Sequence, residues 1–271
     1  MRSTQEGVYE LQIKNLVGYH SGYLQVQNPA YDSEKTLDNS LLFDSSLEKK
    51  IQTISEVTAY TPRIESFVLA ASSETTKGIM LTGSDPAKEN DLTGLKKRVK
   101  EGSYFTKGSD GIMIGKGLAR YLKIGINDTL IFYGSGYHAS SAVDKYPVVG
   151  ILEFGSPQLN DNMAYMPLKA SQNLFSATDL VTSVAINIEN RKALLEVQST
   201  IQSGLDNEVY QVKNWEEMMP ELVNQIEGDR SSGVVMLGVL YMIIGFVIYG
   251  TLLMMISERL REFSMLVAIG M

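Results

Sequence analysis

The pattern of apolar and polar residues divides the chain into two unlike parts. Residues 231–257 contain no charged side chain and are apolar all round a helix, whereas residues 1–230 mix apolar and polar positions. As an α-helix, residues 231–257 would be roughly 40 Å long, against about 30 Å of bilayer hydrocarbon. A soluble helix of that length would need a polar face. We therefore predict one transmembrane helix, in contact with the lipid bilayer, at 231–257.

Residues 1–230 carry the patterns of a domain that mixes strands and helices. Residues 146–154 read as a strand, and residues 183–189 alternate as a strand with one solvent-exposed face. Residues 134–145 are polar, with Gly, Ser and Ala, and predict a loop. Helices are predicted at 116–122, 168–175 and 192–203. Because no strict strand–helix–strand repeat is present, we predict an α+β domain rather than a doubly wound sheet.

We expect this domain to have two lobes. One lobe is formed by residues 8–75 together with 165–225, and a β-rich lobe is inserted at 78–165. The domain as a whole is assigned to residues 1–230, the transmembrane helix to 231–257 and a short following segment to 258–271.

The end of the domain predicts a helix that runs on into the transmembrane segment. It begins at Trp215, and Pro220 lies near its first turn, where proline is tolerated. A stiff helix over 215–257 could act as a lever between domain and membrane. Its apolar positions can form a wall for an apolar ligand, since Met adapts to irregular shapes, or pack against the domain's own core. These positions are Met218, Met219, Leu222, Val223 and Ile226.

Two glycines inside the transmembrane segment lie seven positions apart. Gly238 and Gly245 therefore share one helix face. Small residues allow a second membrane helix to approach closely, although glycine is also common in membrane helices in general. The pair is a candidate helix-packing surface.

Composition excludes several classes of function. The net charge is −7, and the densest basic run, 96–100, is followed by Glu101, so we predict a solvated short helix there and no nucleic-acid binding. The absence of cysteine removes disulfides and thiolate sites, and His20 and His138 alone give little material for a metal site. Catalytic patterns are equally weak, because Ser46 and Lys49 have no companion motif. We predict no catalytic residue, metal or cofactor.

The segment after the transmembrane helix carries a recognisable motif. Residues 258–270 read ERLREFSMLVAIG. They resemble the E-R-x-R-E-[FI]-x-x-L-x-A-[IL]-G signature that follows the second membrane helix of FtsX-like ABC transporter permeases. This family includes MacB-type exporters and the lipoprotein-releasing permeases LolC and LolE.

The domain resembles the same family at several places. Residues 110–124 with 127–129 are similar to a stretch of its MacB-like periplasmic core domain, except that Asn127 stands where the family commonly has Gly. The segments YPVVGIL at 146–152 and NMAYMPL at 162–168 are similar to two of its strands. The opening, at 7–10 and 22–26, is most similar to the lipoprotein-releasing branch.

The resemblance implies a topology and a mode of action. Residues 1–230 would be periplasmic and 258–271 cytoplasmic, in a bacterial inner membrane. Family permeases have four membrane helices, so the chain would be truncated at both ends and the full-length protein multi-pass. Such a permease performs no bond chemistry: a separate ABC ATPase subunit hydrolyses ATP, and the permease transmits the motion to its periplasmic domain. The implied ATPase-coupling residues are Glu258, Arg259, Arg261, Glu262 and Gly270.

Within this family, lipoprotein release towards the outer membrane is the favoured function. It implies a second permease subunit, lipoprotein cargo and a periplasmic carrier as partners. MacB-type efflux of drugs or peptides and signalling without transport are the alternatives inside the family. Outside it, a single-span membrane-anchored binding or sensor protein and a membrane-tethered enzyme stay open.

Overall fold

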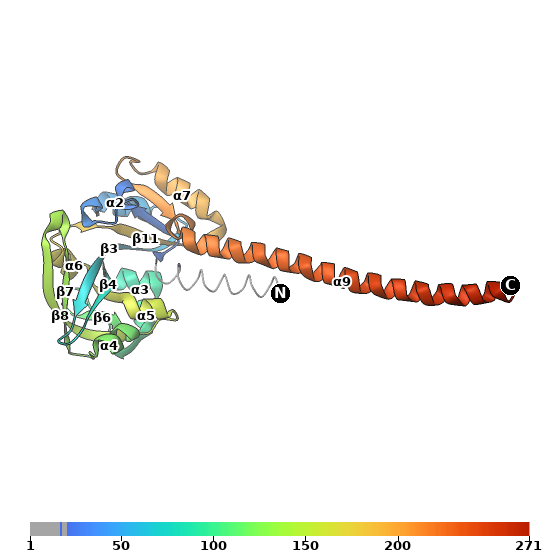
Figure 1. Cartoon of the computed structure of the whole chain (residues 1–271). Helices are drawn as coiled ribbons and strands as arrows, with labels where there is room; N and C mark the ends of the chain where they lie inside the picture. Colours follow the sequence, from blue (N-terminus) through green and yellow to red (C-terminus); the bar gives the residue numbers. More distant parts are fainter. Residues whose placement is uncertain (1–16, 18–20, 271) are drawn as a thin grey trace. The chain divides into compact units, whose positions relative to one another are not determined.

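The structure, a computed structural model, describes residue 17 and residues 21–270, apart from the side chains at positions 230 and 261–263. The chain forms two compact units, with the boundary after Met218 (Figure 1). The first unit is the α+β domain and the second consists of one long helix. Each unit is described by itself.

A mixed ten-stranded sheet forms the centre of the domain. Its strand order is β12-β1-β11-β3-β4-β9-β6-β8-β5, and β7 pairs with both β3 and β8. Two pairs, β4–β9 and β6–β8, are parallel and the others are antiparallel. The strands are β1 (Leu24–Gln27), β3 (Val57–Ala71), β4 (Thr76–Ser84), β5 (Val99–Gly102), β6 (Ile112–Gly115), β7 (Thr129–Ser135), β8 (Ser141–Leu152), β9 (Met163–Pro167), β11 (Ser183–Ile188) and β12 (Gln211–Asn214). A separate small sheet pairs β2 (Leu41–Leu42) with β10 (Leu180–Val181).

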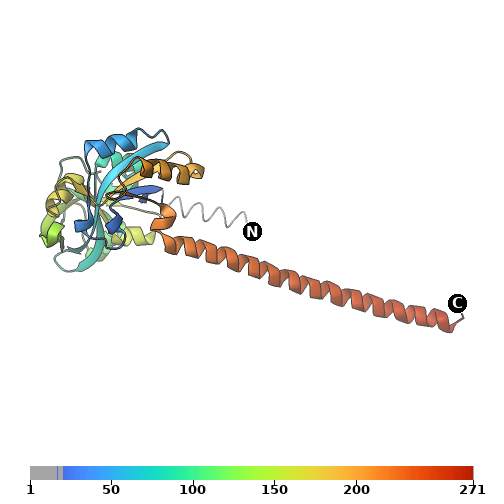
Figure 2. The same cartoon turned by 90° about the horizontal axis from the view of Figure 1, so that it is seen from above.

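Helices surround this sheet, and α2 and α7 lie side by side in both views (Figures 1 and 2). The helices of the domain are α2 (Ser45–Gln52), α3 (Pro86–Thr93), α4 (Lys116–Leu122), α5 (Pro157–Asn162), α6 (Leu168–Leu174), α7 (Leu194–Ser203) and α8 (Trp215–Met218). Short 3-10 helices are η2 (Pro29–Tyr31), η3 (Leu37–Asn39), η4 (Leu95–Arg98), η5 (Tyr137–Ala139) and η6 (Arg191–Ala193). The second unit contains α9 (Pro220–Ala268).

Alternation along the strands places apolar side chains on both faces of the sheet. In β6, Ile112 and Ile114 join the larger core cluster, which includes residues of α4 and α6. Met113, between them, joins a second cluster with Leu95 of η4 and Phe105. Successive strand residues point to opposite faces, so the middle strands are buried on both sides.

The long strand β3 connects the two proposed lobes. Its first half pairs with β11, its second half pairs with β7, and β4 pairs along it from Arg63 to Ala71. The ten-stranded sheet therefore runs through both lobes without interruption. The lobe boundaries themselves stay a prediction.

Two local predictions are wrong. Residues 134–145 are not one loop, because β7 continues to Ser135 and β8 already begins at Ser141, with the two ends paired to each other. Strand β11 has no solvent-exposed face: five of its residues are buried, and the half-buried Asn187 donates from its side-chain amide to the Leu92 carbonyl of α3 (2.7 Å).

Helix α3 was not predicted from the sequence, although its signals are local. The Asp85 side chain accepts hydrogen bonds from the backbone N–H groups of Ala87 (3.0 Å) and Lys88 (3.3 Å). Pro86 occupies the first turn, and Gly94 ends the helix with a positive φ of 66°. Asp before Pro at the start and Gly at the end is a normal helix signature.

Candidate membrane-coupling helix and a buried charge network

Helix α9 contains the whole predicted transmembrane segment. It has 49 residues and is long and apolar enough to cross a membrane by length and composition. The large apolar side chains between Val234 and Ile256 are exposed in the chain by itself. A helix with apolar side chains on all sides needs a nonpolar surrounding, which a bilayer supplies.

The same helix continues beyond the predicted transmembrane segment and ends at Ala268, two residues before the end of the sequence motif at Gly270. Glu258 and Arg259 are exposed on it, whereas the side chains of Arg261 and Glu262 lie outside the described residues. Gly270 has a φ of +84°, and its N–H donates to the carbonyl of Val267 (3.2 Å). This left-handed backbone favours glycine, so the Gly of the motif marks the end of the helix.

The predicted continuous helix from Trp215 is interrupted at Met219. The φ and ψ angles of Met219, −128° and 58°, are not helical. Helix α8 therefore ends at Met218 and α9 begins at Pro220. Pro220 has no N–H to donate and a φ that suits a first turn. The proposed lever therefore begins at Pro220, not at Trp215.

Side-chain and backbone hydrogen bonds fix α8 within the domain just before this interruption. Asn214 and Glu217 cap each other: the Glu217 N–H donates to Asn214 Oδ1 and the Asn214 N–H to Glu217 Oε2, both at 3.0 Å. Gln198 of α7 donates to the same Glu217 oxygen (3.0 Å) and accepts from the Asn214 amide (2.9 Å). The Trp215 N–H donates to the Tyr23 carbonyl (3.0 Å). This reciprocal arrangement is a capping box, formed here by Asn and Glu.

The predicted apolar wall spans the interruption. Met218 ends α8, Met219 is the interrupting residue, and the other three positions lie on the first two turns of α9. All five side chains are partly buried, and Leu222, Val223 and Ile226 occupy one side of α9 because they are spaced by one and three. Their role as a cargo surface stays a prediction.

The glycine pair lies on an open stretch of α9. A Cβ atom built at Gly238 or Gly245 would meet nothing within 4 Å. Both positions are therefore accessible to a neighbouring membrane helix, and their packing role stays a prediction.

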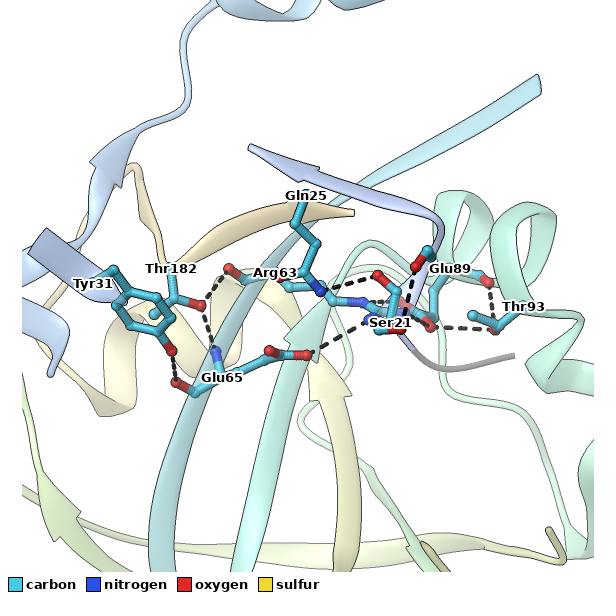
Figure 3. A network of polar contacts seen from close by, with 9 residues as sticks. Ser21, Gln25, Tyr31, Arg63, Glu65, Glu89, Thr93 and Thr182 are labelled. Atoms are coloured by element: carbon cyan, nitrogen blue, oxygen red, sulfur yellow. Dashed lines mark hydrogen bonds and ion pairs between the residues drawn. The ribbon is translucent and has the colours of Figure 1, made fainter. Parts of the chain in front are cut away.

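A fully buried ion pair joins the sheet to α3 (Figure 3). The Arg63 guanidinium of β3 donates to both carboxylate oxygens of Glu89, with Nε–Oε2 at 2.9 Å and Nη2–Oε1 at 2.6 Å. Both side chains have no exposed surface. Burial alone would lower the pKa of Arg63, but the charges of Glu89 and Glu65 outweigh burial and raise it. The pair is bidentate, which is the strong geometry for Arg and a carboxylate.

Neighbouring groups complete this network. The Thr93 hydroxyl lies 3.2 Å from Glu89 Oε1, and Glu65 Oε1 lies 3.6 Å from Arg63 Nη1. The Thr182 hydroxyl accepts from the Glu65 N–H (2.9 Å) and donates to the Arg63 carbonyl (3.1 Å). Because the charges of Arg63 and Glu89 balance each other and both side chains are fully buried, this pair is suited to holding α3 on the sheet. Sequence reasoning missed it, since Arg63 and Glu89 form no local motif.

Among the described residues, no group of three or more His, Asp or Glu side chains is placed to hold a metal ion.

Comparison with known proteins gives matches for the domain. Residues 6–204 match the family model of the MacB-like periplasmic core domain. The periplasmic region of MacB from Actinobacillus actinomycetemcomitans is similar in structure, with a TM-score of 0.53 and 13% identity over 80% of this chain and 98% of that one. The extracellular domain of the noncanonical ABC-type transporter YknZ from Gram-positive bacteria has a TM-score of 0.51 and 19% identity over 71% and 100%. At sequence identities of 19% and 13%, the structural similarity shows a shared fold and nothing more. A search among curated proteins found no match.

Proposed function

Since the chain belongs to the family of MacB-like periplasmic core domains, we propose that it is the permease part of an inner-membrane ABC transporter that releases lipoproteins towards the outer membrane. The chain is a transporter permease component of the MacB and FtsX type, and the family implies an ABC ATPase partner. The predicted fold class, a MacB-like domain followed by one long apolar helix, is confirmed. Its closeness to LolC and LolE stays a prediction.

One observation carries the proposal: the transmembrane segment and the E-R-x-R-E motif lie on one uninterrupted helix. Helix α9 runs from Pro220 to Ala268, so a displacement at Glu258 would be passed along the helix axis to the start of α9. An α-helix is stiff over this length, whereas a flexible linker would absorb the movement.

The proposed mechanism uses no chemistry on this chain. ATP binding and hydrolysis on the separate subunit would shift the cytoplasmic end of α9. Glu258 and Glu262 lie four residues apart, on one side of a helix, and Arg259 and Arg261 can pair with acidic residues of the ATPase. The movement would then reach the domain through the capped helix α8.

The cargo surface would be the apolar wall at the start of α9. A lipoprotein carries acyl chains that must remain shielded from water after leaving the bilayer. Leu222, Val223 and Ile226 are apolar and partly buried, and Met218 and Met219 adapt to irregular ligands. A second permease subunit would complete the enclosure, and a periplasmic carrier would accept the lipoprotein.

The test is a purification of the full-length permease in detergent from its native cells, followed by mass spectrometry. Recovery of an ABC ATPase together with triacylated lipoproteins is the expected result. Recovery of an ATPase together with an outer-membrane channel or adaptor would instead assign efflux as the function of the permease. Recovery without any ATPase, in a preparation that retains other ABC complexes, would overturn the permease assignment in favour of a single-span binding protein.

A further inference from the structure

Six strands of the large sheet close into a ring. The sheet runs from β3 through β4, β9 and β6 to β8, and β7 pairs with both β3 and β8. The six strands therefore form a small barrel. The larger core cluster fills its inside, with residues such as Val68 of β3 and Phe132 of β7. Because neighbouring strand residues point to opposite faces, Leu69 and Tyr133, which follow these two core residues, point outwards.

One part of the outside of this barrel consists of exposed apolar side chains. The exposed fractions are 63% for Phe67, 46% for Leu69, 43% for Tyr133 and 51% for Val143. Leu69 is in register with Tyr133, and Tyr133 with Val143, so these three form one row across β3, β7 and β8. Phe67 lies two residues before Leu69, on the same face of β3. We call these four residues the barrel face.

The aromatic ring at one end of the barrel face is held in place. A Cβ atom built at Gly78 of β4 would collide with the ring of Phe67, so the ring lies directly over this glycine. The ring needs no rearrangement before a partner binds. A fixed aromatic side chain is a typical anchor of a protein interface.

A partner can contact the barrel face only through side chains. At Leu69, β3 is paired with both β4 and β7, and at Tyr133, β7 is paired with both β3 and β8. Neither strand offers a free edge here to which another strand could add. Docking therefore means that the sheet face packs on another apolar surface. Two sheets that pack in this way lie about 10 Å apart.

The charge and the area of the barrel face fit a second copy of this chain. Its four side chains, and the strand residues in register with them, contain no carboxylate, whereas the whole chain has a net charge of −7. Two acidic molecules can meet at such a surface without placing like charges opposite each other. The four side chains expose roughly 400 Å², which is close to the apolar share of the about 800 Å² that each partner buries in a standard interface.

We propose that the barrel face is the contact between two copies of this chain, packed face to face about a two-fold axis. Such a contact uses the same patch on both copies. Tyr133 is the middle residue of the row and lies near the axis. The inference rests on the proposed function for the existence of a second permease subunit. It deepens that function by assigning the subunit as a second copy and by giving it a contact surface on the domain.

The test uses single cysteines, since the chain has none of its own. Sheets packed face to face are too far apart for a disulfide but within reach of a short bis-maleimide. With the full chain in proteoliposomes, Tyr133→Cys should give cross-linked dimers. Leu195→Cys is the control, because Leu195 is 69% exposed and lies on α7, outside the barrel face. Equal cross-linking of both variants, or none of Tyr133→Cys although it reacts with a monofunctional maleimide, would overturn the proposal.

A second pair of variants tests whether apolar contact forms the dimer. In the Tyr133→Cys chain, Leu69→Asp places two like charges in the interface and should lower the yield of cross-linked dimer about tenfold. Leu195→Asp makes the same change at an exposed leucine of α7 and should leave the yield unchanged. Fluorescence of Trp215 shows that each variant is folded. An unchanged yield with Leu69→Asp, or an equal loss in both variants, would contradict the barrel face as the contact.

Cross-linking of the full-length permease in its native membranes identifies any other occupant. A link from Tyr133→Cys to a different protein would assign the barrel face to that protein and overturn the second copy. Labelling of Tyr133→Cys only after the membrane is dissolved, without a cross-linked dimer, would assign a lipid surface and overturn it as well. The proposed function fails separately, because its test is the ATPase recovered during purification.

Discussion

At the scale of single residues, the contact most sensitive to change is the pair between Arg63 and Glu89, since both side chains are fully buried. Glu89→Gln keeps the shape of the side chain but leaves the guanidinium charge without its bidentate partner. We expect the free energy of unfolding to fall by about 3–5 kcal/mol. Urea unfolding of the full chain in detergent, followed by fluorescence of its single tryptophan, Trp215, measures this. Glu101→Gln, an exposed change, is the control, and an equal loss there would contradict the prediction.

A second pair makes stability depend on pH. Glu48 of α2 accepts hydrogen bonds from Lys88 of α3 and from the Tyr60 hydroxyl, and these lower its pKa below the ordinary value. A lowered carboxyl pKa stabilises the fold above the unfolded-state pKa, and this contribution disappears as the pH falls through the folded-state pKa. Glu48→Gln should therefore cost about 1 kcal/mol near neutral pH and almost nothing in strong acid.

Unfolding midpoints of wild type and Glu48→Gln, compared over a series of pH values, check this dependence. Glu74→Gln is the matched control, because its pair with Lys123 is largely exposed and should contribute little at any pH. A difference between wild type and Glu48→Gln that stays constant down to strong acid would rule out the ionised carboxylate as its cause.

At the scale of elements, local signals were enough to predict α4, whereas those of α3 were overlooked and long-range pairing does not appear in local signals. Helix α4 is observed at the predicted bounds, because its apolar positions and the left-handed Lys123 that ends it are set within a few residues. The start of β8 was missed because residues 141–145 become a strand only by pairing with β7. The Arg63–Glu89 pair joins two residues that are 26 positions apart in the sequence. The motif at 258–270 was recognisable because it is contiguous.

The coupling segment gives a prediction at this scale. If Glu258 contacts the ATPase, Glu258→Lys should reduce the ATPase that co-purifies with the full-length permease by about tenfold, as reversal of one interface charge does. Glu227→Lys is the control, because it makes the same charge change on the same helix. Glu227 lies 31 residues, or roughly 46 Å along the helix axis, from Glu258. Quantitative mass spectrometry measures the amount of ATPase in both preparations. Equal recovery of the ATPase with the two variants would place the ATPase contact elsewhere.

At the scale of the whole molecule, the proposal treats α9 as a stiff connection between the ATPase and the domain. Gly228 lies inside α9, just before the transmembrane segment, with no atom near its missing Cβ. Gly228→Pro removes a helical hydrogen bond and clashes with the preceding turn, which kinks the helix at a cost of about 3 kcal/mol. ATP hydrolysis by the reconstituted full-length complex should then continue while cargo release stops, because the movement is lost at the kink.

Gly228→Ala is the counterpart to the proline variant, because alanine favours the helix and fits the open space. It should preserve both hydrolysis and release, since a stiffer helix transmits displacement at least as well. Parallel assays of ATP turnover and cargo release in proteoliposomes separate coupling from folding, as a misfolded permease would lose both activities. Release at the wild-type rate by Gly228→Pro would mean that motion reaches the domain by a route other than the axis of α9.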